Sequence, residues 1–415
     1  MLRVSPLPPN PPPTLPTPLT EELHALYRHL HAHPELSMQE HATAALIEER
    51  MGALGWNTLR CGGTGVVAVL ENGPGPVIGF RADTDGLPVP EDTGLDYAST
   101  ARGILPDGSE VPVMHACGHD THITAAVGAA TLLTQTRTDW SGTVVLVFQP
   151  GEETAAGAVA MLADGLWDKA PRPEVMYAQH VSSGRTGTVR LTSGTAMAMA
   201  DSWEVTVHGV GGHASRPADT VDPILLAAHM VVRLQGVVAR EVPAQDAAVV
   251  SVATFHAGLK ENIIPSEAVL TINVRTLDRA VRERLLAALR RVLSAEAAAS
   301  GAPEPEIREL STFPLLTNDP QETERVTGVL REALGADAVA ERPAQMGSED
   351  FGALPDALGI PGVYWFFGGL SPEVIGSKEP TPANHSPHFA PALEPTLTTA
   401  VTAAYSVLRS RLPSR

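Results

Sequence analysis

Three histidines, an aspartate and a cysteine fall within residues 115–122, "HACGHDTH". Cys117 and His119 are two positions apart, so both side chains can converge on one point of a turned segment. A thiolate and an imidazole are ligands suited to Zn²⁺, Mn²⁺, Co²⁺ or Ni²⁺. Taken alone, this spacing is as compatible with a polar structural turn around a small buried cysteine as with a metal site.

Further acids and imidazoles follow predicted strands. Glu152 and Glu153 come directly after one apolar run, His180 ends another, and Asp83 and Asp85 close a third. Each has a simpler interpretation: glutamates suit the first turn of a helix, and a histidine after an apolar run can be structural. Open α/β sheets, however, bind ligands at the carboxyl ends of their strands. Their shared position favours a site in which one glutamate binds metal and the other is a general base.

Two later segments add imidazoles. "NHSPHF" supplies His385 and His388, and "GVGGHASRP" places His213 among glycines that allow close backbone approach to a ligand. The sequence contains no G-x-S-x-G elbow, phosphate loop or dinucleotide fingerprint. These residues therefore favour metal chemistry over a nucleophilic serine.

The elements that must position these residues indicate an α/β fold. Four Val/Ile-rich runs are predicted as buried strands: 63–71, 76–86, 142–150 and 173–181. Helices are expected from Thr20, as N-cap, to Pro34, over 121–133 and over 151–165. Strands without polar–apolar alternation, separated by helices, are typical of a parallel-rich sheet covered on both faces.

The pattern changes at Asp201. An alternating strand, a helix over 222–240 with Asp222 as N-cap, two strands, a second helix and a strand at "PEIREL" give the order of a split ferredoxin-like domain. The α/β pattern then resumes with "GVYWFFGG" and a C-terminal helix. We therefore expect an inserted domain over 201–312 within a catalytic domain formed by 19–200 and 313–415.

Composition narrows the possible partners and the compartment. The 415 residues carry a formal net charge of −18, which argues against nucleic acid and anionic membranes as partners. Cys61 and Cys117 are the only cysteines, so a disulfide framework is excluded and the cytoplasm is expected. Neither a signal-peptide pattern nor an apolar run of membrane-spanning length is found. The proline-rich residues 1–18 are predicted to form a mobile arm.

In their order along the chain, the motifs resemble those of the aminoacylase-like metallopeptidase family. The matching segments are "RHLHAHPELS", "FRADTDGLPV", "MHACGHDTH", "VFQPGEE", "AQHV", "GGHASRP", "NIIP", "MGSEDF" and "NHSPHF". Within the family they look most like the amidohydrolase branch, which includes hippurate hydrolases, N-acyl-amino-acid amidohydrolases and plant auxin-conjugate hydrolases. The resemblance spans about residues 24–390 and implies a zinc-peptidase-like catalytic domain with an inserted ferredoxin-like lid that mediates dimerisation.

The resemblance also implies roles for individual residues. The residues that match the ligands of two divalent ions are Cys117, His119, Glu153, His180 and His385. Glu152 matches the general acid/base, and Asp83 a carboxylate that orients a ligand. Other branches have a histidine ligand where this chain has Arg81 and an aspartate in place of Cys117, so the metal (Mn, Zn, Co or Ni) stays open. Gly151, where the branch often has alanine, should be tolerated.

Residues of the inserted domain are expected to act on the substrate. His213, supplied by the partner subunit, would hold the oxyanion, and Asn262 and Arg275 are candidates for binding the substrate carboxylate. The implied activity is hydrolysis of N-acetyl- or N-benzoyl-type N-acyl-L-amino acids by a homodimer or higher homo-oligomer. A dipeptidase or carboxypeptidase-like activity on the same scaffold is the alternative enzyme, and a small-molecule binding protein is the non-enzymatic alternative.

Overall fold

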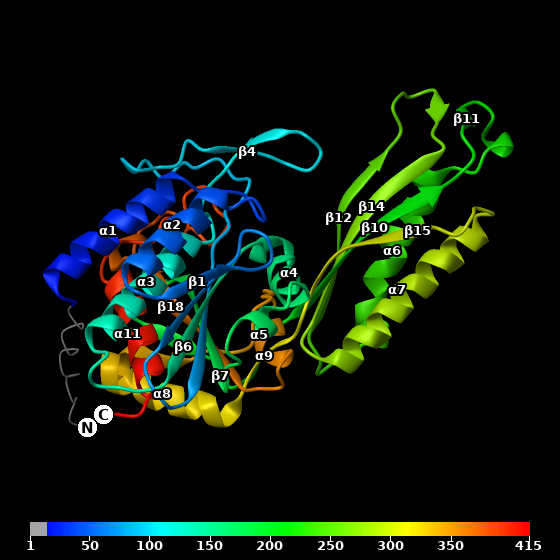
Figure 1. The fold of residues 1–415 in the computed structure, drawn as a ribbon. Coiled ribbons are helices and arrows are strands. Elements are labelled where there is room, and N and C mark those ends of the chain that lie inside the picture. Colours follow the sequence, from blue (N-terminus) through cyan, green and yellow to red (C-terminus); the bar gives the residue numbers. More distant parts are fainter. Residues whose placement is uncertain (1–14) are drawn as a thin grey trace, which may run out of the picture. The chain divides into compact units, whose positions relative to one another are not determined.

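The computed structural model describes residues 15–415, which form two compact units (Figure 1). The first unit runs to Ala196 and continues over Thr317–Pro343 and Asp350–Arg415. The second comprises Met197–Leu316 and Ala344–Glu349. The sequence interpretation left the short segment 344–349 with the catalytic domain, and residues 1–14 of the predicted arm lie outside the described residues.

The first unit is built on an eight-stranded mixed sheet. Its strands, in spatial order, are β1 (Asn57–Arg60), β2 (Val66–Glu71), β6 (Thr143–Gln149), β3 (Val77–Asp83), β7 (Val175–Arg185), β18 (Gly362–Leu370), β8 (Val189–Leu191) and β17 (Val339–Glu341). The central strands β6, β3, β7 and β18 are parallel to their neighbours in this group. Because Asp83 pairs with Gln149 across β3 and β6, the ends of both strands meet at one edge of the sheet.

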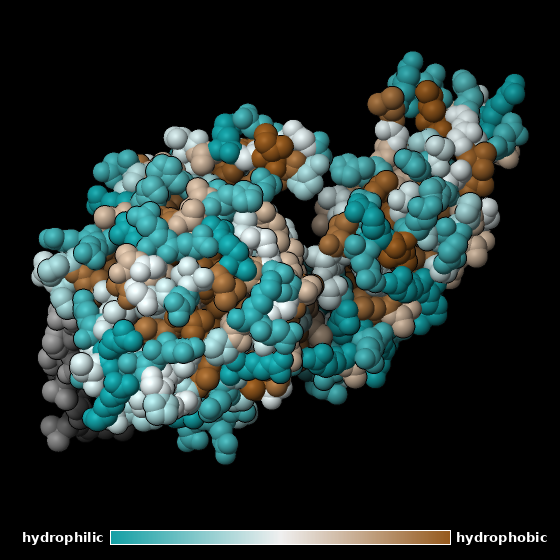
Figure 2. Space-filling view, in the orientation of Figure 1, coloured by the Kyte–Doolittle hydropathy of each residue, from teal (hydrophilic) through white to brown (hydrophobic). Residues whose placement is uncertain are grey.

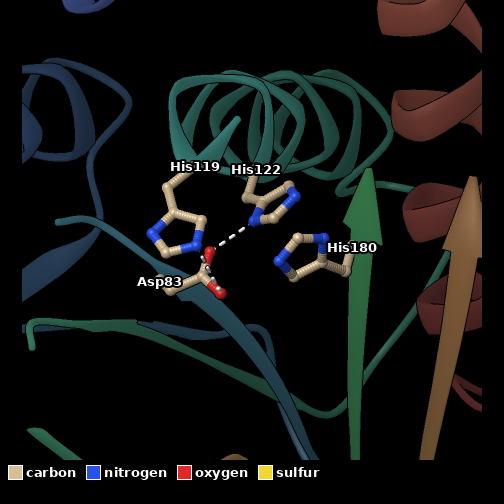
Figure 3. Close-up of side chains that lie close together, drawn as sticks. All are labelled: Asp83, His119, His122 and His180. Carbon is tan, nitrogen blue, oxygen red and sulfur yellow. Dashed lines mark hydrogen bonds and ion pairs between the residues drawn. The ribbon is translucent and has the colours of Figure 1, made fainter. Parts of the chain in front are cut away.

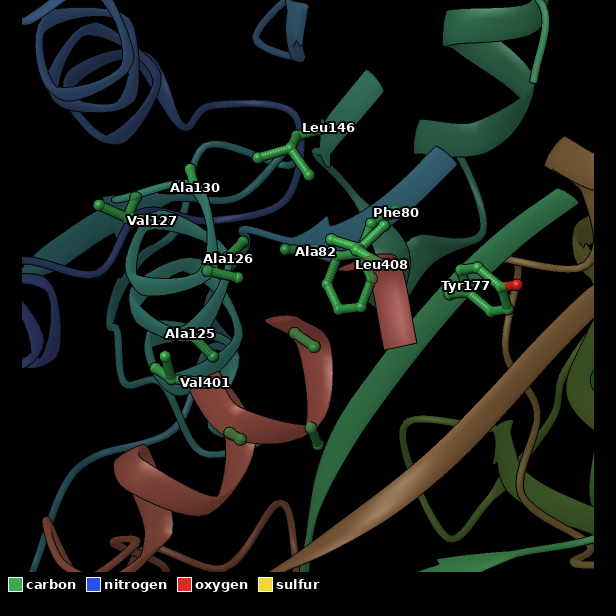
Figure 4. Close-up of a cluster of buried hydrophobic side chains, with 14 of the residues drawn as sticks. Phe80, Ala82, Ala125, Ala126, Val127, Ala130, Leu146, Tyr177, Val401 and Leu408 are labelled. Atoms are coloured by element: carbon green, nitrogen blue, oxygen red, sulfur yellow. The ribbon is translucent and has the colours of Figure 1, made fainter. Parts of the chain in front are cut away.

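Helices pack against this sheet and against one another. The longer ones are α1 (Thr17–Ala32), α2 (His41–Ala53), α3 (His119–Gln135), α8 (Pro320–Leu334) and α11 (Thr396–Arg409). Alanines of α3 and α11 fill the core shown in Figure 4, where Phe80 and Leu146 contribute from the sheet. A Cβ added at Gly128 would lie 2.6 Å from Val401, so this glycine lets α3 approach α11 closely.

Three predicted boundaries were wrong. α1 begins at Thr17, because proline fits the first turn of a helix, where its missing N–H is not needed. The helix expected over 151–165 is a 3₁₀ turn, Glu152–Thr154, followed by α4 (Gly157–Ala163), since Ala155 has a φ of 55°. β7 continues past His180 to Arg185 because its pairing with β18 extends that far.

The second unit is a four-stranded antiparallel sheet with two helices on it. The strand order is β12 (Ala248–Ala257), β14 (Glu267–Thr276), β10 (Met199–His208) and β15 (Glu306–Phe313), and the helices are α6 (Pro223–Glu241) and α7 (Arg279–Ala299). The predicted α/β fold with an inserted ferredoxin-like unit is therefore confirmed.

Local signals in α6 act as predicted. Asp222 accepts hydrogen bonds from the N–H groups of Ile224 and Leu225 and so caps the helix. By length and composition alone, α6 could cross a membrane, but one face of it, including Leu226 and Leu234, is buried in the core of this unit.

Candidate metal centre

Five side chains from four separate segments of the first unit form a continuous cluster of potential metal donors. Cys117 Sγ lies 3.4 Å from His180 Nε2, and His119 Nε2 lies 3.8 Å from Glu153 Oε1. His385 Nε2 is 3.4 Å from the same Glu153 oxygen. The ligand atoms of Cys117, His119 and Glu153 all lie within 4.8 Å of one another. The structure therefore brings together every residue that the sequence interpretation assigned to metal binding.

Backbone conformation places these donors. Gly118, with a φ of 79°, joins Cys117 to α3, and a Cβ there would lie 2.4 Å from Val181. Only glycine fits both restrictions, and His119 therefore starts the helix beside β7. His385 donates its backbone N–H to the carbonyl of Ala116 at 2.8 Å, which attaches the C-terminal loop to the same turn.

Hydrogen bonds set the tautomers of two candidate ligands. His119 donates from Nδ1 to Asp85 Oδ1 at 3.2 Å, and His180 donates from Nδ1 to the carbonyl of Val181 at 2.6 Å. Each ring therefore presents the lone pair of Nε2 to the cluster. Within residues 15–415, His119 Nε2 and Glu153 Oε1 are buried without a hydrogen-bond partner. Two unsatisfied buried acceptors that face one another fit a bound cation.

The electrostatics of the cluster also favour a cation. Burial lowers the pKa of His119, but Asp83, Asp85 and Glu153 outweigh burial and raise it to about 10. Burial, with Glu153 and further carboxylates, raises the pKa of the Cys117 thiol well above its usual range. Positive charge is therefore stabilised here, and the thiol needs a bound cation in order to ionise.

Asp83 lies close to three histidines, His119, His122 and His180 (Figure 3). One of its oxygens accepts from His122 Nδ1, and the other accepts from Arg81 at 2.6 Å and lies 3.7 Å from His119 Nε2. His122 Nε2 accepts from the N–H of Val181 at 2.8 Å. Because both nitrogens of His122 are engaged, this histidine supports Asp83 and β7 and offers no lone pair to a metal.

Arg81 fills the position where other branches carry a histidine ligand. It lies 3.0 Å from Asp350 Oδ1 and donates from Nε to Gln149 at 3.0 Å, in addition to its ion pair with Asp83. Its charge holds the pKa of Asp83 well below the usual range despite burial, with help from His119 and His122. The guanidinium thus compensates the negative charge of the buried carboxylates and does not serve as a metal ligand.

Glu152 begins the 3₁₀ turn at the end of β6 and is buried. Gly151, directly before it, has a φ of 55°, and a Cβ there would meet Met38 Sδ at 2.6 Å. Glycine therefore suits this position, where the branch often has alanine. Glu153, the neighbour of Glu152, pairs with His119 and His385.

Sequence reasoning did not assign the role of Asp85. This buried carboxylate accepts from His119 Nδ1, from the backbone N–H of Glu153 at 3.1 Å and from Ser37 Oγ at 2.6 Å. Asp85 thus holds two candidate ligands at once, whereas the orienting role had been given to Asp83. The available signal was its place two residues after Asp83 in "RADTDG".

Two other histidines of the motifs lie outside the donor cluster. His388 is exposed and hydrogen-bonds through Nδ1 to the carbonyl of Asp92. His115 is buried beneath the loop, and within residues 15–415 neither of its ring nitrogens has a hydrogen-bond partner. Asp120 accepts from His31 Nδ1 at 2.7 Å, which joins this loop to α1.

The second unit brings together His213 and Asn262. His213, in β11 (Gly212–His213), pairs with Ile263 in β13 (Ile263–Ile264), and Ala214 N–H donates to the Asn262 carbonyl at 3.1 Å. His213 Nδ1 accepts from the backbone N–H of Ser215, so the exposed ring carries its proton on Nε2.

Arg275 lies in β14 of the same unit and is half-buried. Its acceptors are Asn273 Oδ1 at 2.9 Å, the carbonyl of Met346 at 2.9 Å and Ser348 Oγ at 3.4 Å. None of these partners is a carboxylate. Arg275 therefore does not form the surface ion pair that is common for arginines in strands.

Comparison with known proteins agrees with the geometry. Residues 79–410 match the model of peptidase family M20/M25/M40. The hippurate hydrolase of Campylobacter jejuni is 36% identical over 80% of this chain and 85% of its own length. A thermostable carboxypeptidase of Saccharolobus solfataricus is 34% identical over 87% and 88%. The solved structure of a dinuclear metal-binding M20 peptidase from Bacillus subtilis superposes with a TM-score of 0.73, at 30% identity over 95% of this chain and 99% of that one.

The family match covers most of the chain, and residues 79–410 include all five clustered donors and Glu152. The resemblance stated from the motifs is therefore confirmed: the chain belongs to peptidase family M20/M25/M40.

Proposed function

We propose that this protein is a metal-dependent amidohydrolase that cleaves the amide bond of N-acyl-L-amino acids, of N-acetyl or N-benzoyl type, to a carboxylic acid and an amino acid. The observation that carries the proposal is the convergence of Cys117, His119, Glu153, His180 and His385, with two buried acceptors left unsatisfied. The name of the C. jejuni relative, a hippurate hydrolase, supports this substrate class.

The donor set suits two divalent cations, as in the dinuclear B. subtilis relative. Such ions polarise an amide carbonyl and lower the pKa of water toward neutrality. Mixed thiolate, imidazole and carboxylate donors suit Zn²⁺, Mn²⁺, Co²⁺ or Ni²⁺ more than Mg²⁺ or Ca²⁺.

Glu152 is the proposed proton carrier. It takes a proton from the attacking water and later delivers it to the nitrogen of the departing amine. Its neighbour Glu153 faces His119 and His385, which leaves the two adjacent carboxylates with separate tasks.

His213, Asn262 and Arg275 are proposed to act on the substrate. The Nε2–H of His213 suits donation to an oxyanion, because Ser215 keeps Nδ1 as an acceptor. Arg275 has only neutral partners among the described residues, so its charge is available for the substrate carboxylate.

The second unit is proposed to mediate a homodimer or higher homo-oligomer. Apolar side chains are visible on its surface in Figure 2. Leu225 and Val232 of α6 are 60% and 74% exposed, and edge strand β12 exposes Val249 and Phe255. Sedimentation of F255E should show a shift toward monomer. The cytoplasm remains the proposed compartment, since both cysteines are free.

A dipeptidase or carboxypeptidase-like activity is the second candidate, and the carboxypeptidase relative favours it. Assays of the metal-loaded protein with N-acetyl amino acids, N-benzoyl amino acids and dipeptides would separate the two activities. Faster turnover of dipeptides than of every N-acyl amino acid would reverse the assignment.

Two substitutions test the roles in the centre. E152Q should keep the metal content of the wild type and lose about 10²–10⁴ in kcat, since proton transfer is removed and the ligands stay. C117S should lose metal instead, measured by elemental analysis. Retained turnover in E152Q, or full metal occupancy in C117S, would contradict the corresponding role.

A further inference from the structure

Glu40 is neither a candidate ligand nor a proton carrier, yet it contacts the turn that carries Glu152. It is fully buried. Its Oε1 accepts from the backbone N–H groups of Met38 and Gly151, each at 2.8 Å, and its Oε2 accepts from the hydroxyl of Thr64. Three donors on one buried carboxyl hold it in a single orientation.

The peptide group on each side of Gly151 is hydrogen-bonded. Its N–H donates to Glu40, and its carbonyl accepts from the N–H groups of Ala156 and Gly157 at 3.1 and 3.2 Å. The φ of 55° at Gly151 is one that glycine adopts without strain. Because Glu152 follows directly, the orientation of the Gly151 residue decides the direction in which the Glu152 side chain leaves the backbone.

We propose that Glu40 is a positioning residue that keeps the Glu152 carboxylate aligned for proton transfer by fixing the N–H of Gly151. This inference rests on the proposed role of Glu152. Without Glu40, the Gly151 N–H becomes a buried donor with no acceptor, and the turn rotates toward another partner. A displacement of about 1 Å at a reacting group costs about 10²-fold in rate.

The chain offers a conservative variant and a matched control. In E40Q the amide oxygen can accept from Met38 and Gly151, and the amide N–H can donate to Thr64. E40A removes all three interactions. Glu35 provides the control, because it lies in the same segment and also accepts two backbone N–H groups, those of Ala42 and Thr43 at 3.0 and 2.8 Å. Its two donors belong to the first turn of α2 and not to the turn that carries Glu152.

The experiment measures kcat, KM, metal content and thermal stability for wild type, E40A, E40Q, E35A and E152Q. We expect kcat of E40A to fall about 10- to 100-fold with KM and metal content within twofold of wild type, and E40Q to stay within threefold. E35A should lose stability without this loss of kcat. If E40A is not recovered folded, E40D is judged by the same criteria, since its shorter carboxylate withdraws from Gly151.

The outcomes separate this inference from the proposed function. A kcat of E40A equal to that of E35A, beside a large loss in E152Q, overturns the positioning role alone. A loss of metal in E40A, or a loss in E40Q as large as in E40A, also overturns it, because fixing one N–H then fails to explain the effect. Retained activity in E152Q overturns the proton-transfer role and the positioning role together.

Discussion

The two units hold their proposed functional residues in opposite ways. In the first unit, Cys117, His119 and His180 are buried, and hydrogen bonds from their own unit fix the tautomers of both rings. In the second unit, His213 and Asn262 are exposed. The proposed metal ligands therefore depend on the hydrogen-bond network of one unit. Of the residues proposed to act on the substrate, His213 and Asn262 are not shielded from water by the other unit, and Arg275 is half-buried. Metal affinity and turnover should accordingly be separable by mutation.

Among the substitutions that test this comparison, the largest expected effect is on turnover alone. H213A should lower kcat by about 10²–10³, because a donor to the oxyanion is removed. Metal content and stability should not change, since the ring is exposed and its hydrogen bonds are with nearby Ser215. A loss of metal in H213A would contradict the expectation that metal affinity depends on the first unit alone.

The converse substitution acts on the first unit. D85N should weaken metal binding about 10- to 100-fold, measured by titration of the metal-free protein, because Asp85 holds both His119 and the Glu153 backbone. D107N, in an exposed carboxylate that bonds only with nearby Ser109, is the control. Wild-type affinity in D85N would show that the ligands are positioned by other groups.

A smaller effect is expected at Arg275. R275A should raise KM about tenfold for N-acyl amino acids, the loss of about one charge-assisted hydrogen bond. The corresponding amino-acid amides lack the carboxylate and serve as control substrates, whose KM should not change. An equal rise in both KM values would assign Arg275 to the stability of its unit.

The smallest effect on turnover, but a clear one on stability, is expected for His31. Burial lowers its pKa, but bonds to Asp120 and Glu91 outweigh burial and raise it to about 9. Its other titratable neighbours are Tyr27, Tyr97 and His115. The pKa of His31 in the folded protein exceeds its ordinary value of 6.5. The interactions of protonated His31 with Asp120 and Glu91 therefore stabilise the fold fully below pH 6.5, and this stabilisation is lost as pH rises through 9.

Urea unfolding of the metal-free protein at pH 6, 7.5 and 9 measures this loss. The contribution of His31 to the free energy of unfolding should fall by up to about 3 kcal/mol across that range in the wild type. H31Q should lack this contribution and keep the dependence due to His119, whose pKa is raised to about 10. An identical slope in both proteins would show that another group titrates there.

Local signals in the sequence predicted the fold class, whereas the set of metal donors came from the resemblance of the motifs to the family. Apolar runs without alternation predicted parallel strands, and acids or imidazoles after those runs predicted the edge at which they meet. Asp83 and Asp85 could not be separated in this way. They lie two positions apart, and only the packing of α3 against β3 decides that Asp85 takes His119 Nδ1 while Asp83 takes His122.

Long-range hydrogen bonds could not be predicted from such sequence patterns. Glu40 and Gly151 are 111 positions apart, and neither residue type alone indicates a contact. The break in the helix expected over 151–165 has the same origin, since Gly157 N–H reaches back to the Gly151 carbonyl and leaves Ala155 with a φ of 55°. A local propensity for helix was overridden by the geometry of the turn.

Arg81 supplies a positive charge that is covalently part of the chain and that a chelator cannot remove. Its guanidinium stays protonated at any pH that a protein survives, and it bonds to Asp83 and Asp350 whether or not other ions are present. The residues of β3 should therefore keep their conformation during purification in EDTA, while the proposed ligands Cys117 and His385 lose their ions. We therefore expect that metal ions can be removed from the centre and bound again without refolding of β3.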